Sequence, residues 1–136
     1  MELEFGMAKK KNTARKLSIP KDPKVFEFKV SLPGTKPLVW RSLLAHEFIE
    51  LEELHGLIQI TMGWNSYHLY QFQIGDVIYT DAETASELKN AKVISGQVLH
   101  EVLGDNKKFS YTYDFGDDWL HEIEIVATHP HDSRMQ

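Results

Sequence analysis

Two alternating segments that meet at a Gly- and Asp-containing turn constrain the fold of this chain more than any other feature. Residues 108–114 carry an aromatic side chain at every second position, and residues 119–125 alternate Trp, His and Ile with Leu and Glu. A period of two gives each strand one apolar face. The sequence therefore predicts a β-hairpin whose apolar face lies in the core, with Trp119 buried and His121 beside it.

The polar residues of this hairpin have two interpretations. An imidazole that points inward needs partners for both ring nitrogens, and the nearest carboxylates along the chain include Asp114 and Asp117. Either an Asp/His pair lines a cleft, where it binds a metal or moves a proton, or His121 is a core histidine held by a carboxylate of the turn. The spacing leaves both open.

Alternation also predicts the remaining strands. Apolar residues recur at every second position in residues 26–32, and a short turn connects them to the β-rich residues 38–44, so these segments predict an antiparallel hairpin. Residues 68–74 predict a third strand that places His68 on its apolar face, and the two-residue turn after them leads into residues 77–79.

One segment has helical periodicity. Apolar residues recur every three or four positions from Phe48 to Met62, and Gly63 provides a C-terminal stop. Residues 80–96 are expected to form a loop with one helical turn, and residues 98–103 a short helix. The predicted fold is a single α+β domain, with a largely antiparallel sheet and one long helix (about 47–62) packed on one face.

Histidines on separate elements form the best indication of a site. His68 and His121 fall on the apolar faces of their strands, and His55 flanks the apolar stripe of the helix. Together with Asp114 or Asp117 they could form a nitrogen and carboxylate metal site. Taken alone, each histidine is more simply explained as a hydrogen-bonded core residue.

Composition narrows the class of protein. A chain of 136 residues has the length of one domain, and the absence of cysteine excludes disulfides, thiol nucleophiles and zinc–thiolate sites. We expect a cytoplasmic protein with no membrane span. The expected organisation is a flexible arm at 1–23, a domain at 24–128 and a frayed tail at 129–136.

Charge is unevenly distributed along the chain. The net charge is −5; residues 1–24 hold seven basic and three acidic residues, a net +4, so the remaining residues carry −9. The basic arm could contact nucleic-acid phosphates, or it could be only a solvated leader. Its candidate phosphate contacts are Lys9, Lys10, Lys11, Arg15 and Lys16.

Three blocks of sequence carry a family resemblance. They are Val39-Trp40-Arg41 after Pro37, LEELHGLIQITMGWNSYHLYQF, and YTYDFGDDWLHEIEI. With these blocks in this order, residues 24–127 resemble the Ri-plasmid ORF-three-like family, also described as TnpR-like transposon passenger proteins. The resemblance implies a bacterial or archaeal α+β domain encoded beside mobile elements, and it implies no particular reaction. Family members usually continue into a Cys-Pro-Pro-Glu-Asp-like motif, so we expect a short or truncated member.

Three functions from different classes are compatible with the sequence. The first, which we favour, is a non-catalytic binding or interaction module in which Trp40, Trp64, Trp119 and tyrosines line a groove for a peptide, a nucleic acid or a small ligand. The second is a metal-dependent hydrolase or nuclease that uses the residues His55, His68, His121, Asp114 and Asp117. The third is a DNA-associated protein that binds phosphates through the arm. The sequence names no substrate, cofactor, metal or oligomeric state.

Overall fold

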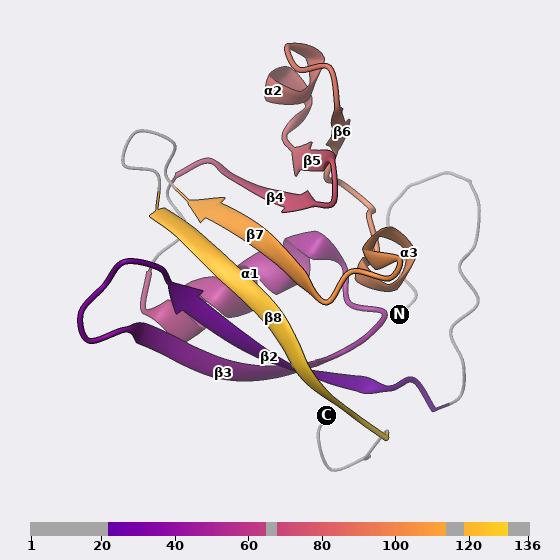
Figure 1. Cartoon of the computed structure of the whole chain (residues 1–136). Coiled ribbons are helices and arrows are strands. Elements are labelled where there is room, and N and C mark those ends of the chain that lie inside the picture. The colour runs from indigo at the N-terminus through magenta and orange to yellow at the C-terminus, as the bar shows by residue number, and fades with distance from the viewer. Residues whose placement is uncertain (1–21, 65–67, 114–118, 131–136) are drawn as a thin grey trace.

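Seven strands form one sheet in the order β3-β2-β8-β7-β4-β5-β6 (Figure 1). The computed structural model describes residues 22–64, 68–113 and 119–130. All neighbouring strands are antiparallel except β5 and β6, which are parallel. The predicted α+β domain with a largely antiparallel sheet is therefore confirmed. The strands are β2 (Val25–Leu32), β3 (Val39–His46), β4 (Tyr70–Ile74), β5 (Val77–Thr80), β6 (Ala91–Val93), β7 (Lys108–Tyr113) and β8 (Trp119–His129).

The predicted hairpins form with the expected pairing. In β7 and β8, Tyr111 lies opposite His121. In β2 and β3, Phe28 lies opposite Leu43. The two-residue turn between β4 and β5 needs a positive φ at Gly75, which has φ +60°, and glycine adopts this conformation without a Cβ clash. Strand β8 continues to His129, the first residue of the expected tail.

Helix α1 (Leu51–Met62) lies across one face of the sheet (Figure 1). It buries Leu51, Leu54 and Ile58 completely, and each such side chain contributes about 1.5–3 kcal/mol of hydrophobic free energy. The face of the sheet beneath it supplies most of the remaining core, to which Ile49, Ile94, Leu99 and Leu103 also contribute. The buried strand residues of this core are Phe28, Val30, Leu43, Phe72, Ile74, Tyr79, Phe109, Tyr111, Tyr113, Ile123 and Ile125.

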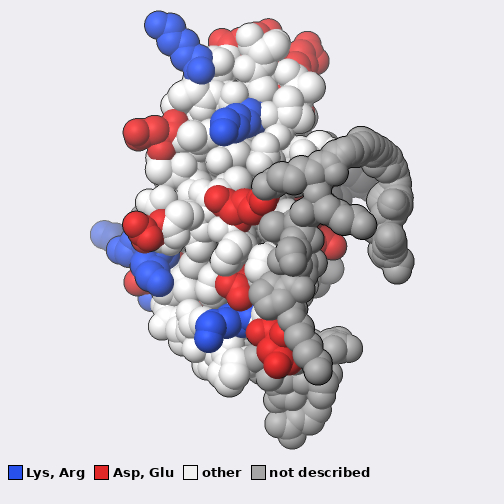
Figure 2. All heavy atoms as spheres, turned by 90° about the vertical axis from the view of Figure 1, so that its right-hand side faces the viewer, with Lys and Arg blue, Asp and Glu red and all other residues white. Residues whose placement is uncertain are grey.

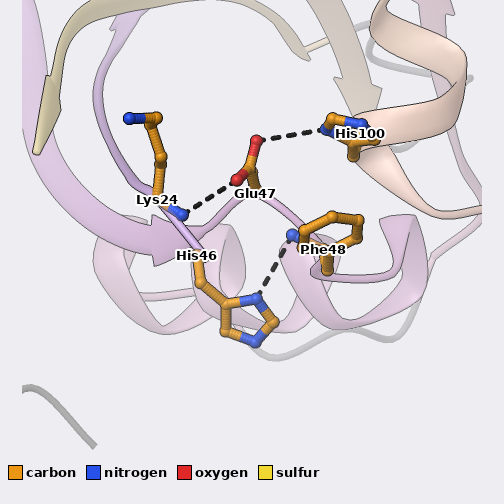
Figure 3. A network of polar contacts seen from close by, with 5 residues as sticks. All are labelled: Lys24, His46, Glu47, Phe48 and His100. Atoms are coloured by element: carbon orange, nitrogen blue, oxygen red, sulfur yellow. Dashed lines mark hydrogen bonds and ion pairs between the residues drawn. The ribbon is translucent and has the colours of Figure 1, made fainter. Parts of the chain in front are cut away.

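The prediction that this helix begins at residue 47 was wrong. Glu50 is the N-cap, and a capping box joins it to Glu53, so the helix begins at Leu51. The carboxylate of Glu47 accepts a hydrogen bond from the backbone N–H of Lys24 (2.8 Å), and its second oxygen lies 3.1 Å from His100 Nδ1 (Figure 3). Glu47 therefore connects the start of β2 to the short helix α3 (Leu99–Leu103) instead of opening α1.

A small unit that the sequence predicted only in part follows β5. A loop with one helical turn was expected at residues 80–96; the structure has the helix α2 (Ala82–Ser86) and also the strand β6. Together with β5 they extend beyond the edge that α1 covers (Figure 1). The Asp81 carboxylate caps α2 by accepting a hydrogen bond from Thr84 N–H (3.0 Å). A five-residue helix and a three-residue strand are too short to give a periodic signal.

The opposite face of the sheet carries alternate side chains of β3, β2 and β8. Trp40 is 49% exposed there, and the Lys29 ammonium lies 5.3 Å from its ring centroid. Because Trp40 alternates with the core residue Leu43, it points away from α1. The expected groove shared by Trp40, Trp64 and Trp119 is therefore not formed.

Candidate functional site

The end of α1 places an indole against the sheet. Gly63 ends the helix in the left-handed conformation (φ +79°), and the Trp64 N–H then donates to the Gln59 carbonyl (2.8 Å). The Trp64 ring centroid lies 5.0 Å from that of Tyr113 and 5.1 Å from that of His121. We call His55, Gln59, Trp64, Tyr111, Tyr113 and His121 the aromatic–histidine cluster.

His121 is closed to solvent at the centre of this cluster. Its side chain is 0% exposed, and Nδ1 lies 3.0 Å from the Trp119 carbonyl oxygen and 3.3 Å from that of Tyr111. Nδ1 therefore carries the proton and donates to the main chain, while Nε2 has no hydrogen-bond partner within the described residues. Burial lowers the pKa of His121, so the ring is neutral. It is a core histidine held by backbone carbonyls; Asp114 and Asp117 lie outside the described residues.

Tyr111 connects the sheet to α1 through its buried hydroxyl. Gln59 Nε2 donates to Tyr111 Oη (2.9 Å), and Tyr111 Oη lies 2.6 Å from His55 Nδ1. Burial lowers the pKa of His55 to about 4. At neutral pH the imidazole is therefore uncharged, and its Nδ1 accepts a hydrogen bond from the hydroxyl of Tyr111. The imidazole of His55 also stacks on Tyr70, with ring centroids 3.5 Å apart.

The sequence indicated His55 but missed Gln59, Tyr70 and Tyr111 as its partners. Gln59 follows Ile58 on the buried side of α1 and is 2% exposed, so an amide within the apolar stripe is the signal that could have indicated it. The sequence places Tyr70 and Tyr111 on apolar strand faces and predicts no contact between either of them and His55. Their hydroxyl groups and ring stacking depend on how the helix crosses the sheet.

Two residues of the expected site are more exposed than predicted. His68 precedes β4 and is exposed, although its ring still contacts Tyr113 (5.6 Å between centroids). Trp119 is 44% exposed because it is the first residue of β8, at the end of the sheet, where its ring contacts Trp64 (5.6 Å). The predicted burial of Trp119 was therefore wrong.

The described residues of the chain contain no cluster of side chains that could form a metal centre. Across residues 22–64, 68–113 and 119–130, no group of three or more His, Asp or Glu side chains lies close enough to hold a metal ion. His121 and His68 contact different members of the stacked Trp64–Tyr113 pair: the ring of His121 contacts Trp64, and the ring of His68 contacts Tyr113. A site that includes Asp114 or Asp117 remains a prediction from the sequence.

A cavity opens where α1, β4 and the β5–α2–β6 unit meet. Its volume is about 410 Å³, within the range of small-molecule sites. Thr80, which is fully buried, connects its walls because its hydroxyl is 3.5 Å from the Tyr70 carbonyl oxygen and 3.3 Å from the Asp81 carboxylate. The lining residues are Glu52, Leu69, Tyr70, Asp81, Ala82, Val93, Ile94 and Ser95.

The polar side chains at this cavity are the carboxylates of Glu52 and Asp81, the phenol of Tyr70 and the hydroxyl of Ser95. Hydrogen bonds from Thr84 hold the pKa of the Asp81 carboxyl below its ordinary value. Burial, with the negative charge of Glu52 added, raises the pKa of Tyr70 to about 12. The cavity therefore combines apolar walls, an ionised carboxylate and a neutral phenol.

Acidic side chains occur over the surface next to α3. Figure 2 shows Asp and Glu from the top to the bottom of this face with separate Lys and Arg side chains between them, so its described residues form no continuous basic patch. The arm candidates Lys9, Lys10, Lys11, Arg15 and Lys16 lie outside the described residues. Among the elements described, no helix has the length and apolar character needed to cross a membrane.

Known proteins resemble this chain over most of its length. A model of the plasmid pRiA4b ORF-3-like proteins matches residues 24–136. The uncharacterized protein y4hQ of Sinorhizobium fredii is 37% identical over 110 residues, which are 78% of this chain and 55% of y4hQ. The crystal structure of MM3350, a protein of unknown function from Methanosarcina mazei Go1, superposes with a TM-score of 0.74 at 28% identity, covering 82% of this chain and 64% of MM3350. The chain thus spans little more than half the length of y4hQ and under two thirds of MM3350.

Proposed function

We propose that the chain, which belongs to the family of plasmid pRiA4b ORF-3-like proteins, works as a non-catalytic binding module. Its ligand enters the cavity between α1, β4 and the β5–α2–β6 unit. The observation that carries this proposal is the cavity itself, which combines about 410 Å³ of space with apolar walls and a few polar groups. Sites for small ligands have this composition.

The state of the histidines supports binding over catalysis. A general base needs to reach the substrate, but His121 is enclosed and its protonated nitrogen is held by carbonyls. His55 accepts a hydrogen bond from the Tyr111 hydroxyl and stacks on Tyr70, and it is not among the residues that line the cavity. Both imidazoles thus serve packing and hydrogen bonding, which leaves the cavity as a place that holds a ligand.

Titration with a small neutral alcohol tests this proposal. We expect 2-phenylethanol to cause saturable shifts in amide correlation spectra at Leu69, Val93 and Ile94, because these residues line the cavity. Val93→Trp should fill the cavity and abolish these shifts.

Val126→Trp is the matched control. Val126 and Val93 are both exposed strand valines (48% and 42%), but Val126 lies on β8, away from the cavity. Its replacement should leave the shifts unchanged. Absence of saturable shifts in the wild type, or shifts that persist in Val93→Trp, would overturn the proposal.

A cytoplasmic location and an association with mobile elements form part of the same proposal. The family takes its name from a plasmid, which supports the association with mobile elements. Phosphate binding by the basic arm is a separate prediction from the sequence. It would be tested by deleting residues 1–24 and measuring DNA affinity over a range of salt concentrations.

A further inference from the structure

We propose that the cavity selects small amphipathic cations, in which an aliphatic or aromatic body carries one ammonium group. This inference rests on the proposed function, because it names the chemical class of the ligand for the same cavity.

The walls provide the contact for an apolar body. Leu69 and Val93 are large apolar side chains left exposed at the cavity (55% and 42%), and the buried Ile94 also lines it. Covering such surface contributes about 25 cal/mol per Å². The ring of Tyr70 adds an aromatic surface, which also favours a cation placed over its face.

The charges on the walls have one sign. Glu52 from α1 and Asp81 at the start of α2 contribute carboxylates, and none of the described lining residues is Lys, Arg or His. Asp81 stays ionised because Thr84 N–H donates to its carboxylate. Glu52 is close enough to Tyr70 to raise the pKa of that phenol.

The histidine that contacts the cavity wall, His55, adds no positive charge that would weaken the attraction of a cation. His55, which stacks on Tyr70, has its pKa lowered to about 4 by burial and is neutral at pH 7. Residues 25–136 carry a net charge of −9, and acidic groups recur across the face in Figure 2. An anion would be repelled from this surface, whereas a cation would be attracted to it.

Three probes of similar shape test the inference: 2-phenylethylamine, 2-phenylethanol and 3-phenylpropanoate. They share an aryl body and differ in charge, and their affinities are measured from the amide shifts of Leu69 and Val93 at low salt. We expect the amine to bind about fivefold more tightly than the alcohol, since one partly exposed ion pair provides this much. The carboxylate should bind most weakly, and added salt should reduce the preference for the amine.

Variants assign the preference to the carboxylates. Glu52→Gln and Asp81→Asn should each reduce the ratio of amine to alcohol affinity, and Asn at position 81 can still cap α2. Glu83→Gln is the control, because Glu83 lies on α2 but does not line the cavity. It should leave the ratio unchanged, and thermal unfolding of each variant verifies that it folds.

The outcomes separate this inference from the proposed function. Equal binding of amine and alcohol, tighter binding of the carboxylate, or a ratio unchanged by both Glu52→Gln and Asp81→Asn would overturn the cation preference and leave the binding module intact. Failure of all three probes would overturn both proposals.

Discussion

The aromatic–histidine cluster and the cavity differ in their access to solvent: the centre of the cluster is closed to solvent, and the cavity is open to it. In the cluster, His121, Tyr111 and Gln59 are all buried and hydrogen-bonded to one another or to the main chain. At the cavity, Leu69 and Val93 are exposed beside two carboxylates. Tyr70 lies between the two regions, since its ring stacks on His55 of the cluster and also lines the cavity.

This contrast teaches that a concentration of reactive residue types does not by itself mark a ligand site. Burying an imidazole or a phenol is costly unless its polar atoms are hydrogen-bonded, so the cluster needs those partners simply to exist within a core. The residues of the cavity are chemically ordinary, but they leave space and face solvent. Access therefore distinguishes the two regions better than residue type.

The largest effect should follow from removing the centre of the cluster. Tyr111→Ala is expected to lower the free energy of unfolding by about 3–5 kcal/mol, because it removes a fully buried aromatic ring and leaves a cavity. Urea unfolding measures this loss.

Tyr111→Phe is the control that separates the ring from the hydroxyl. It keeps the ring but removes the partner of His55 Nδ1 and Gln59 Nε2, and it should cost about 1–3 kcal/mol. If Tyr111→Ala cost no more than Tyr111→Phe, the cluster would not be the packed core described above.

Acid should destabilise the cluster through His55. The pKa of this imidazole is about 4 in the folded protein, lowered by burial from 6.5, so between these values the unfolded chain binds more protons and stability rises with pH. On going from pH 7 to pH 4.5, His55 should account for a loss of about 2 kcal/mol, less than the full shift would give because the ring is only partly enclosed. Well above pH 6.5, where the imidazole is neutral in both the folded and the unfolded chain, it should contribute no pH dependence.

The measurement compares urea unfolding of the wild type with that of His55→Gln at both pH values. Glutamine does not titrate, and its amide can still pair with the Tyr111 hydroxyl. The variant should therefore lose about 2 kcal/mol less than the wild type on acidification. An identical loss in both proteins would mean that His55 is already accessible to protons. His121, whose pKa is also lowered by burial, contributes in the same direction in both proteins.

The smallest effect is expected at the margin of the cluster. Trp119→Ala should cost about 1–2 kcal/mol, since the ring is 44% exposed and contacts mainly Trp64. Trp40→Ala, on the opposite face, serves as a comparison and should cost less than about 1 kcal/mol. A loss of 3 kcal/mol or more for Trp119→Ala would mean that Trp119 is packed as tightly as the buried residues of the cluster. Trp119 would then not differ from the cluster in its contribution to stability.

Local pattern determined the strands and which of them form hairpins. The alternation in residues 108–113 and 119–125 gives each arm one apolar face, and this pattern predicts the antiparallel hairpin of β7 and β8. Alternation likewise predicts the hairpin of β2 and β3, and the short helix expected at residues 98–103 forms as α3. The pairing of Tyr111 with His121 is decided by the structure, because a shift of two residues would keep the same faces on the core. The acidic body and the basic arm follow from composition alone.

Tertiary structure decided where helices begin, which polar atoms meet and where space remains. Residue Glu47 has helix-forming character, but its carboxylate is taken by Lys24 N–H and His100, which come from distant parts of the chain. The 2.6 Å contact of His55 with Tyr111 joins residues 56 positions apart. The cavity brings together Glu52, Tyr70, Asp81 and Val93 from four elements or their ends. No local periodicity encodes such meetings, because they depend on the crossing of α1 over the sheet and on the parallel addition of β6, and these are properties of packing between segments.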